Sequence, residues 1–282
     1  MNPITAIVQR NLLNYVRSKG RVLGSLFMSM FMLVTFSFLM KSSMSGLDAP
    51  MNYLISGVII MSVFQVSVNN SSDILSDISS GYMKEVLVAP IARTQISMGH
   101  ILSGAVIATL QGVVTMICGI VLGLRVGILQ ILFLTAVMLV SAMAFSAIGL
   151  FLATVSRNSP AFQTLSSMIM MPLTFVSGAY IPTTIIPGVL LPIVYLNPLT
   201  YATSIFRYLT LGAHTLTTEE LVEQGMAFSI CGFVITPLMG LAITIFIGAF
   251  FFVLCVRKFD RADFSTIKVA AGMRGGGAPA RR

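Results

Sequence analysis

The sequence predicts an all-α integral membrane protein with six transmembrane helices, an N-terminal amphipathic helix and a re-entrant helical segment on the outer side. Composition is the first reason, because 56% of the 282 residues are hydrophobic and only 9% are charged. A soluble domain carries about 25% charged residues, and a soluble domain this apolar would expose large hydrophobic patches and aggregate. The second reason is a series of long uncharged stretches. The third is a net charge of +8, because membrane proteins collect Lys and Arg in their cytoplasmic connections.

An amphipathic helix is expected over residues 1–21, ahead of the first span. Asn2 and Pro3 form a suitable helix start. Apolar side chains share one helical face, whereas Gln9 and Arg10 fall elsewhere. The apolar positions are Ile4, Ile7, Val8, Leu12, Tyr15 and Val16. Such a helix would lie on the inner leaflet of the membrane.

Residues 22–256 are expected to form the transmembrane domain. A helix needs about 20 apolar residues to cross a bilayer. The stretches that lack Asp, Glu, Lys and Arg are 22–40, 49–72, 94–124, 126–156, 158–206 and 224–256. Each can hold one span. The first run is longer than the apolar core of a signal peptide, so we expect it to be a span rather than a cleaved signal peptide.

The fifth stretch is too long for one span and is interrupted by prolines, each of which removes a backbone donor. They are Pro172, Pro182, Pro187, Pro192 and Pro198. We therefore expect one span over about 161–179 and a short re-entrant or interfacial helical pair over about 181–207. Two complete spans in this stretch are the alternative.

Basic residues indicate the orientation of the chain. With six spans, 14 of the 17 Lys and Arg residues fall on the side of the termini, and only Lys41, Arg125 and Arg207 fall on the other. Cytoplasmic connections carry the excess of basic residues, so the sequence predicts a multi-pass protein of the inner or plasma membrane with both termini in the cytoplasm. The basic, Gly-rich tail over residues 257–282 is expected to be disordered.

Several kinds of chemistry are missing from the sequence. No charged residue falls in the middle of a predicted span, which argues against proton-coupled carriers and pumps. The phosphate-binding pattern G-x-x-x-x-G-K-[ST] is absent. His100 and His214 lie far apart in the topology, and metal sites need convergent ligands. We therefore expect no metal site, no cofactor and no enzymatic activity in this chain, and no nucleic-acid partner.

The connection from Asp73 to His100 is the most informative one. Its middle, Tyr82 to Val88, is expected to form a short helix that ends before Pro90. Met83, Val86 and Leu87 would share one face, and Lys84 and Glu85 would lie on another. An ordinary solvated connection is the alternative interpretation.

This connection resembles a known motif. The run Gly81-x-x-Lys84-Glu85-x-Leu87-Val88-Ala89-Pro90-x-x-Arg93 is similar to the one between spans two and three of type-2 ABC exporter permeases, in the daunorubicin-resistance and nodulation-export branch. Two downstream segments also resemble that family: Ser177-Gly178 with Pro182, and Asn197-Pro198 with Tyr201 and Arg207. The order of amphipathic helix, spans and re-entrant segment fits over the whole chain.

The sequence departs from the family at one position. The family often has an Asp three residues before the Arg, where this chain has Ser204. Arg207 therefore needs a partner other than that Asp, or serves as an anchor at the outer membrane interface.

The resemblance implies the permease subunit of an ATP-driven exporter for an amphipathic small molecule, a drug, a lipid or a glycolipid. Two permease subunits, identical or paralogous, would pair with two copies of a separate ABC ATP-binding subunit. That partner would bind and hydrolyse ATP with Mg. Residues of about 76–92 would dock on it, through Gly81, Met83, Lys84, Glu85, Val86, Leu87, Pro90 and Arg93. An outer gate would involve Ser177, Gly178, Pro182, Asn197, Pro198, Tyr201 and Arg207.

Two other classes of function are weighed against this one. A secondary transporter or channel without an ATPase partner predicts polar or charged residues along a pore, and such residues are scarce in the predicted spans. A membrane assembly factor or transferase predicts a catalytic group of residues in a loop, and the sequence offers none.

Overall fold

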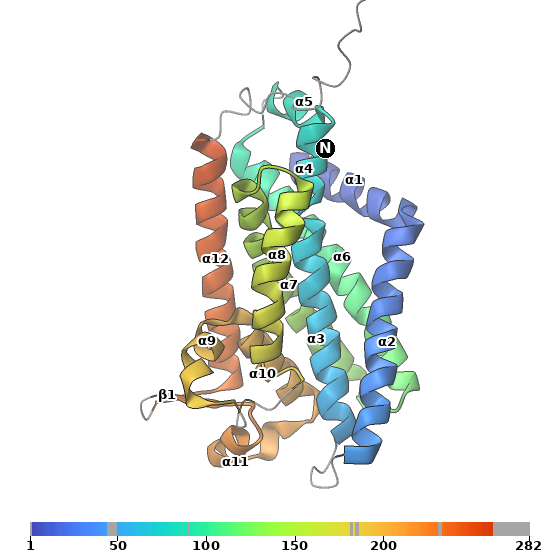
Figure 1. Ribbon diagram of the computed structural model, residues 1–282, viewed down its shortest axis with the longest axis vertical. Helices are drawn as coiled ribbons and strands as arrows, with labels where there is room; N and C mark the ends of the chain where they lie inside the picture. The colour runs from blue at the N-terminus through green and yellow to red at the C-terminus, as the bar shows by residue number, and fades with distance from the viewer. Residues whose placement is uncertain are drawn as a thin grey trace, which may run out of the picture.

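The computed structural model describes residues 2–43, 50–88, 91–180, 183, 186–230 and 233–261. Long helices run side by side and form an elongated bundle (Figure 1). They are α2 (Lys19–Ser43), α3 (Pro50–Asn70), α6 (Arg93–Val121), α7 (Ile128–Val155), α8 (Ser159–Val176) and α12 (Pro237–Arg261). Each overlaps one of the stretches expected to contain a span.

Four helical segments are long and apolar enough to cross a membrane, judged by length and composition of the described residues. They are Asn52–Ser79, which joins α3 to the short α4 (Asp73–Ser79), and Arg93–Val121, Ile128–Val155 and Pro237–Lys258. Helix α8 carries Gln163, Thr164 and Ser166 in its first half, which lowers its hydropathy. The side chains of α2 are described only up to Thr35. An all-α membrane bundle is therefore confirmed, whereas the count of six spans stays a prediction.

Helix α3 lies at the centre of the bundle, in contact with α2, α6, α7 and α10 (Pro198–Thr210). Its apolar side chains are almost all buried, and Phe64 meets Phe145 of α7 edge to face, with 4.9 Å between ring centroids. Helix α12 lies at the periphery and packs along α7. A movement of α3 therefore affects more neighbours than a movement of α12.

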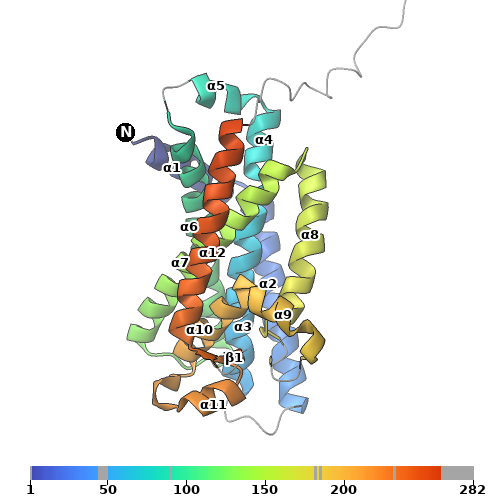
Figure 2. The same cartoon turned by 90° about the vertical axis from the view of Figure 1, so that its left-hand side faces the viewer.

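The two ends of the bundle carry different short elements (Figures 1 and 2). Helices α1 (Pro3–Arg17), α4 and α5 (Tyr82–Val88) lie at one end, called here the α5 end. The other, called the α11 end, carries α9 (Leu191–Leu196), α10, α11 (Thr218–Glu223) and two short strands. The 3-10 turns Gly188–Leu190 and Ala213–Thr215 complete the described elements.

The helix expected at the N-terminus is present as α1, with Pro3 as its first residue. Ile7, Asn11 and Tyr15 are its buried side chains and pack onto α6. Gly99 of α6 makes this approach possible, because a Cβ atom at that position would lie 3.0 Å from the Ile7 side chain. The buried face thus includes Asn11, a polar residue that the apolar pattern did not include.

The last uncharged stretch differs from the expectation, because α12 begins only at Pro237. The residues before it include strand β1 (Phe228–Ile230), which pairs antiparallel with β2 (Phe233–Ile235). Proline lacks the N–H that a longer helix would need there. At its other end α12 continues to Arg261, so residues 257–261 are helical and the expectation of a disordered tail from 257 is wrong for them. Residues 262–282 lie outside the described part.

The segment expected to be re-entrant is broken, as the prolines predict. The 3-10 turn and α9 together make a bend of 83° with α10, which is a geometry of a broken span or a re-entrant loop. No helix of membrane-crossing length runs through Pro187 in the described residues, because α9 has only six residues and begins after it. Helix α10 extends beyond Arg207 to Thr210.

Candidate functional site

Helix α5 has the bounds that the sequence predicts, Tyr82–Val88. Gly81 lies before it with φ +82°, a left-handed conformation that glycine adopts without steric cost. This residue turns the chain between α4 and α5, so that α5 stands at the very end of the bundle (Figure 2). Glu85 is exposed there. Arg93, at the far end of the predicted docking stretch, is the first residue of α6.

The apolar face of α5 is turned partly toward this chain. The Met83 side chain is 2% exposed and belongs to the main hydrophobic core, and Val86 packs against that core. This differs from the expectation that Met83 would contact a partner, since its surface is already covered. The side chains of Lys84 and Leu87, and all of Pro90, lie outside the described residues, and their predicted roles stay predictions.

Arg10 connects three elements at the α5 end. It forms an ion pair with Asp77 of α4, with 2.8 Å between Nη1 and Oδ2. Its guanidinium carbon also lies 3.8 Å from the centroid of the Tyr82 ring in α5. The hydrogen bond to Asp77 is the largest of the effects that raise the pKa of Arg10, so the cation is retained. Helices α1, α4 and α5 are thereby linked through one side chain.

A second ion pair joins the start of α2 to α4, with 2.8 Å between Nη1 of Arg21 and Oδ1 of Asp73. Sequence reasoning missed both pairs. The available signal was the spacing of Asp73 and Asp77, four residues apart and therefore on one helical face, opposite a basic N-terminal region.

Arg207 is buried at the α11 end, with 1% of its surface exposed. It donates hydrogen bonds to the carbonyl oxygens of Gly178 (3.1 Å) and Ala179 (3.4 Å). It also reaches the carbonyl of Tyr53 in α3 at 3.5 Å. The side chain is thus no anchor at the membrane interface. Backbone carbonyls bind the Arg207 guanidinium, which in this chain has no Asp at position 204 to pair with. The Ser204 hydroxyl at that position donates to the carbonyl of Met226.

The turn after α8 is seated directly on α3. Gly178 has φ +81°, and the Ser177 hydroxyl accepts a hydrogen bond from the Ala179 N–H at 3.2 Å. Gly57 of α3 faces this turn, and a Cβ atom there would lie 2.2 Å from the Ala179 oxygen. The close approach places the Gly178 and Ala179 carbonyls within reach of Arg207. Pro182, further along the segment, lies outside the described residues.

Asn197 caps α10 and ties it to α8. Its Oδ1 accepts from the Leu199 N–H at 3.0 Å, and its Nδ2 donates to the Leu173 carbonyl at 2.7 Å. Pro198 occupies the first turn of α10, where its missing N–H costs nothing. The Tyr201 hydroxyl donates to the carbonyl of Tyr195 in α9 at 2.7 Å. Arg207 therefore joins α10 to Gly178 and to α3, whereas Asn197 joins the start of α10 to Leu173 of α8.

Two cavities lie between α2 and α3, one bordered by Gln163 of α8 and the other by Tyr180 after α8, and the surface that carries them is called here the polar furrow. At the α5 end it opens into a cavity of about 270 Å³. A smaller cavity of about 30 Å³ lies further toward the α11 end, beside Tyr180. The polar lining residues are Tyr15, Arg21, Ser25, Ser29, Ser62, Gln65, Asn69, Asn70, Ser72 and Gln163.

Helix α3 provides the main wall of the polar furrow. Ser62, Gln65 and Asn69 recur at three- and four-residue spacing, which places them on one helical face. Asn70 is 7% exposed, and its Oδ1 has no hydrogen-bond partner among the described residues. A buried amide without a partner is costly, so this wall is suited to a polar ligand group or to water. Sequence reasoning missed the furrow, although the spacing of these residues was visible.

Metal-ligating side chains do not converge in the part of the chain that the structure describes. No group of three or more His, Cys, Asp or Glu residues there could hold an ion. His100 lies with its Nδ1 3.4 Å from the amide nitrogen of Asn11, at the contact of α6 with α1. The contacts described above are hydrogen bonds, ion pairs and close helix packing, which hold helices against one another.

Sequence comparison with known proteins identifies the family of this membrane helix bundle. Residues 2–211 match the family model described as "ABC-2 type transporter". The chain is 25% identical to "Nodulation protein J" of Azorhizobium caulinodans over 262 residues, which cover 90% of this chain and 96% of that protein. It is 26% identical to "Inner membrane transport permease YadH" of Escherichia coli K12 over 164 residues, 57% of this chain and 63% of the relative. The chain belongs to the ABC-2 type transporter family, and is a membrane permease of that family.

Proposed function

We propose that this chain is the permease subunit of an ATP-driven exporter, and that a separate ATP-binding-cassette subunit supplies the energy. Helix α5 is the observation that carries the proposal. It is a seven-residue helix at the extreme end of the bundle, between two membrane-length helices, with Glu85 exposed. A short, positioned helix of this kind is suited to dock in a groove of a partner.

The contacts of α5 offer a route for coupling. Tyr82 stacks under Arg10, Arg10 pairs with Asp77, and α4 continues almost directly into α3 as one segment of membrane-crossing length. A displacement of α5 by the ATPase would therefore be passed to α3, the central helix. We propose that the ATPase closes on binding ATP and Mg, and that this closure shifts α3 relative to α2 and α8.

The substrate path in this proposal is the polar furrow. Its wall on α3 carries the polar side chains of Ser62, Gln65, Asn69 and Asn70 beside the apolar ones of Val58, Met61 and Val66. That combination suits an amphipathic substrate, such as a drug, a lipid or a glycolipid. A second permease subunit, identical or paralogous, would close the furrow, and two ATPase copies would serve the pair.

The orientation follows from the distribution of charge. The α5 end carries α1, the start of α2 and the last turns of α12, where most of the basic residues of the described chain lie. Basic residues accumulate on the cytoplasmic side. We therefore propose that both termini and α5 are cytoplasmic, that the α11 end faces outward, and that transport runs from the α5 end to the α11 end of a cell inner or plasma membrane.

The test is co-expression of the permease with candidate cassette ATPases from the same genome, followed by purification through a tag on the permease. Leu87→Asp adds a charge to α5, and we expect it to reduce ATPase recovery ten-fold or more, since burial of a leucine side chain is worth about 1.5–3 kcal/mol. Val189→Asp is the matched control, because Val189 is 88% exposed at the α11 end. Equal recovery of the ATPase with both variants would contradict the proposal.

A further inference from the structure

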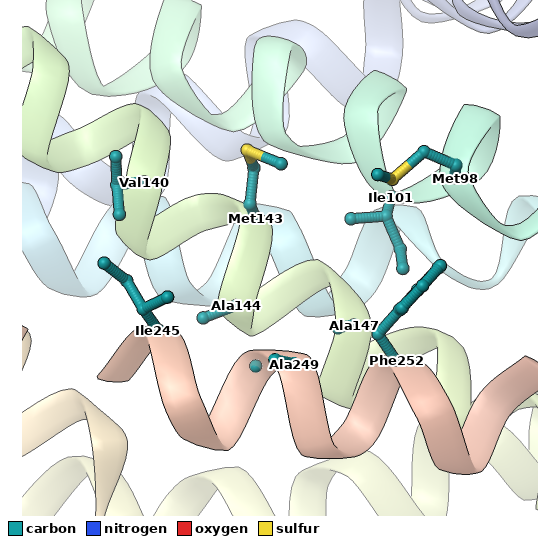
Figure 3. A pocket seen from close by; sticks show the side chains of 10 residues that line it. Met98, Ile101, Val140, Met143, Ala144, Ala147, Ile245, Ala249 and Phe252 are labelled. Carbon is teal, nitrogen blue, oxygen red and sulfur yellow. The ribbon is translucent and has the colours of Figure 1, made fainter. Parts of the chain in front are cut away.

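A second concave surface lies between α6, α7 and α12. It is a half-open apolar groove of about 280 Å³ (Figure 3). Its base is formed by small residues: a Cβ atom on Gly248 would lie 2.6 Å from the Ala144 Cβ atom, so α12 and α7 are in contact there. Met98 of α6 and Ile245 and Phe252 of α12 form the walls. The groove exists because small side chains meet at the base and large ones stand at the rim.

The groove lies at the depth of lipid chains. Its three helices are all of membrane-crossing length and composition. Met98 and Ile245 at the rim are 38% and 49% exposed, so it opens to the surroundings of the bundle. From Ile245 to Phe252 it extends about 10 Å along the helix axis, at about 1.5 Å per residue. One leaflet of the hydrocarbon core is about 15 Å thick, so the groove covers most of the length of one acyl chain.

Positive charge lies at the end of the groove nearest the α5 end. Lys258 is exposed, and its Nζ lies 5.9 Å from the centroid of the Phe151 ring. Phe151 is on the same face of α7 as Ala144, seven residues further along. Arg257 is exposed next to Lys258. The contact between α7 and α12 therefore leads from an apolar groove to Lys258, and Arg257 adds a second positive charge at the same level of α12.

The spacing between groove and cations fits a phospholipid. Lys258 follows Phe252 by six residues, or about 9 Å along a helix. The headgroup layer on each side of a membrane is about 5–7 Å thick, and a lysine side chain extends further toward the phosphates. Basic pockets between transmembrane helices bind anionic headgroups. We propose that this groove is a binding site for an anionic phospholipid, with one acyl chain in the groove and the phosphate at Lys258 and Arg257. The inference does not depend on the proposed exporter function.

The experiment is native mass spectrometry of the full chain in neutral detergent, titrated with phosphatidylglycerol or with phosphatidylcholine of the same chain length. We expect the parental chain to retain phosphatidylglycerol in preference to phosphatidylcholine. Ala249→Phe fills the groove from α12 and should weaken binding of both lipids ten-fold or more. Ala242→Phe is the matched control, because Ala242 is an exposed alanine of the same helix outside the groove lining.

The charge pair is tested separately, with variants that leave the packed helices untouched. Replacing Arg257 and Lys258 together by Gln should reduce the preference for phosphatidylglycerol roughly thirty-fold, because each basic residue contributes about 1 kcal/mol of attraction to an anionic headgroup. Binding of phosphatidylcholine should be unchanged. Arg125→Gln, at an exposed position of the α11 end, should change nothing. Equal weakening by Ala249→Phe and Ala242→Phe, or an unchanged lipid preference in the double Gln variant, would overturn the assignment.

Discussion

The guanidinium carbon of Arg207 lies 3.3 Å from the centroid of the Tyr53 ring, so a buried cation of α10 is stacked on an aromatic ring of α3. The same guanidinium binds the carbonyls of Gly178 and Ala179. One side chain thus joins the central helix, the turn after α8 and the broken segment at the α11 end. In the proposed exporter this contact would hold the outer gate against α3.

We expect Arg207→Lys to destabilise the protein even though the charge is kept. An ammonium group cannot reproduce the planar fork that contacts several carbonyls and stacks on the ring. A hydrogen bond to a charged group contributes about 1.5–3 kcal/mol, so a loss of about 2 kcal/mol in the free energy of unfolding is expected. Thermal unfolding in detergent measures it, with exposed Arg125→Lys as the control. Equal melting temperatures for the two variants would show that Arg207 does not hold this contact.

Gly57→Ala tests how closely the turn approaches α3. The new methyl group would lie 2.2 Å from the Ala179 oxygen, well inside van der Waals contact, so turn and helix must separate. Overpacking of this kind costs about 1–3 kcal/mol. Gly24→Ala in α2 has no atom within 4 Å of its new Cβ and should be neutral or slightly stabilising. A Gly57→Ala protein as stable as Gly24→Ala would contradict the close packing of the turn.

The pair of Arg10 and Asp77 is tested by a double-mutant cycle. Arg10→Gln leaves the Asp77 carboxylate, only 9% exposed, without its counter-ion, and Asp77→Asn removes the charge that Arg10 binds. Because the two side chains are in contact, we expect a coupling energy of about 1–3 kcal/mol from unfolding measurements. Arg17→Gln, exposed on the same helix, is the control. Additive effects of the two substitutions would mean that α1 and α4 are not coupled through this pair.

The polar furrow should be hydrated. Single cysteines in place of Gln65 and Asn69, on its α3 wall, should react with a water-soluble thiol reagent, because the thiolate forms readily only where water has access. A cysteine in place of Phe250, which is 53% exposed on α12, should react far more slowly because lipid surrounds it. Labelling rates in membrane vesicles measure the difference. Equal rates at the three positions would argue against a water-accessible furrow.

Much of the framework could be predicted from the sequence because it depends on local rules. Long uncharged runs predicted the long helices, and prolines predicted where α5 ends and where the segment after α8 is broken. The run before Pro237 shows the limit of this reasoning. An apolar stretch has the same pattern in a buried helix as in a short strand, so the hairpin of β1 and β2 was not foreseen.

The contacts of the candidate site were less predictable, because they depend on which surfaces meet. The apolar face of α5 was expected to bind a partner, yet an apolar face can equally turn inward, and Met83 does so. The partners of Arg207 are mainly backbone carbonyls, which every residue has and which no sequence pattern marks. The polar furrow exists only once α2, α3 and α8 lie side by side, so no single helix identifies it.

The most direct test of the proposed function is a crosslink from α5 to the ATPase. In a chain whose Cys118, Cys231 and Cys255 are replaced by Ala, a cysteine in place of Glu85 is derivatised with a short photoreactive reagent in membranes that contain the co-expressed cassette ATPase. Glu219, exposed at the α11 end, provides the matched position. The account predicts a permease–ATPase crosslink from position 85 and none from position 219. A crosslink from position 219, or none from position 85 in a complex that hydrolyses ATP, would contradict it.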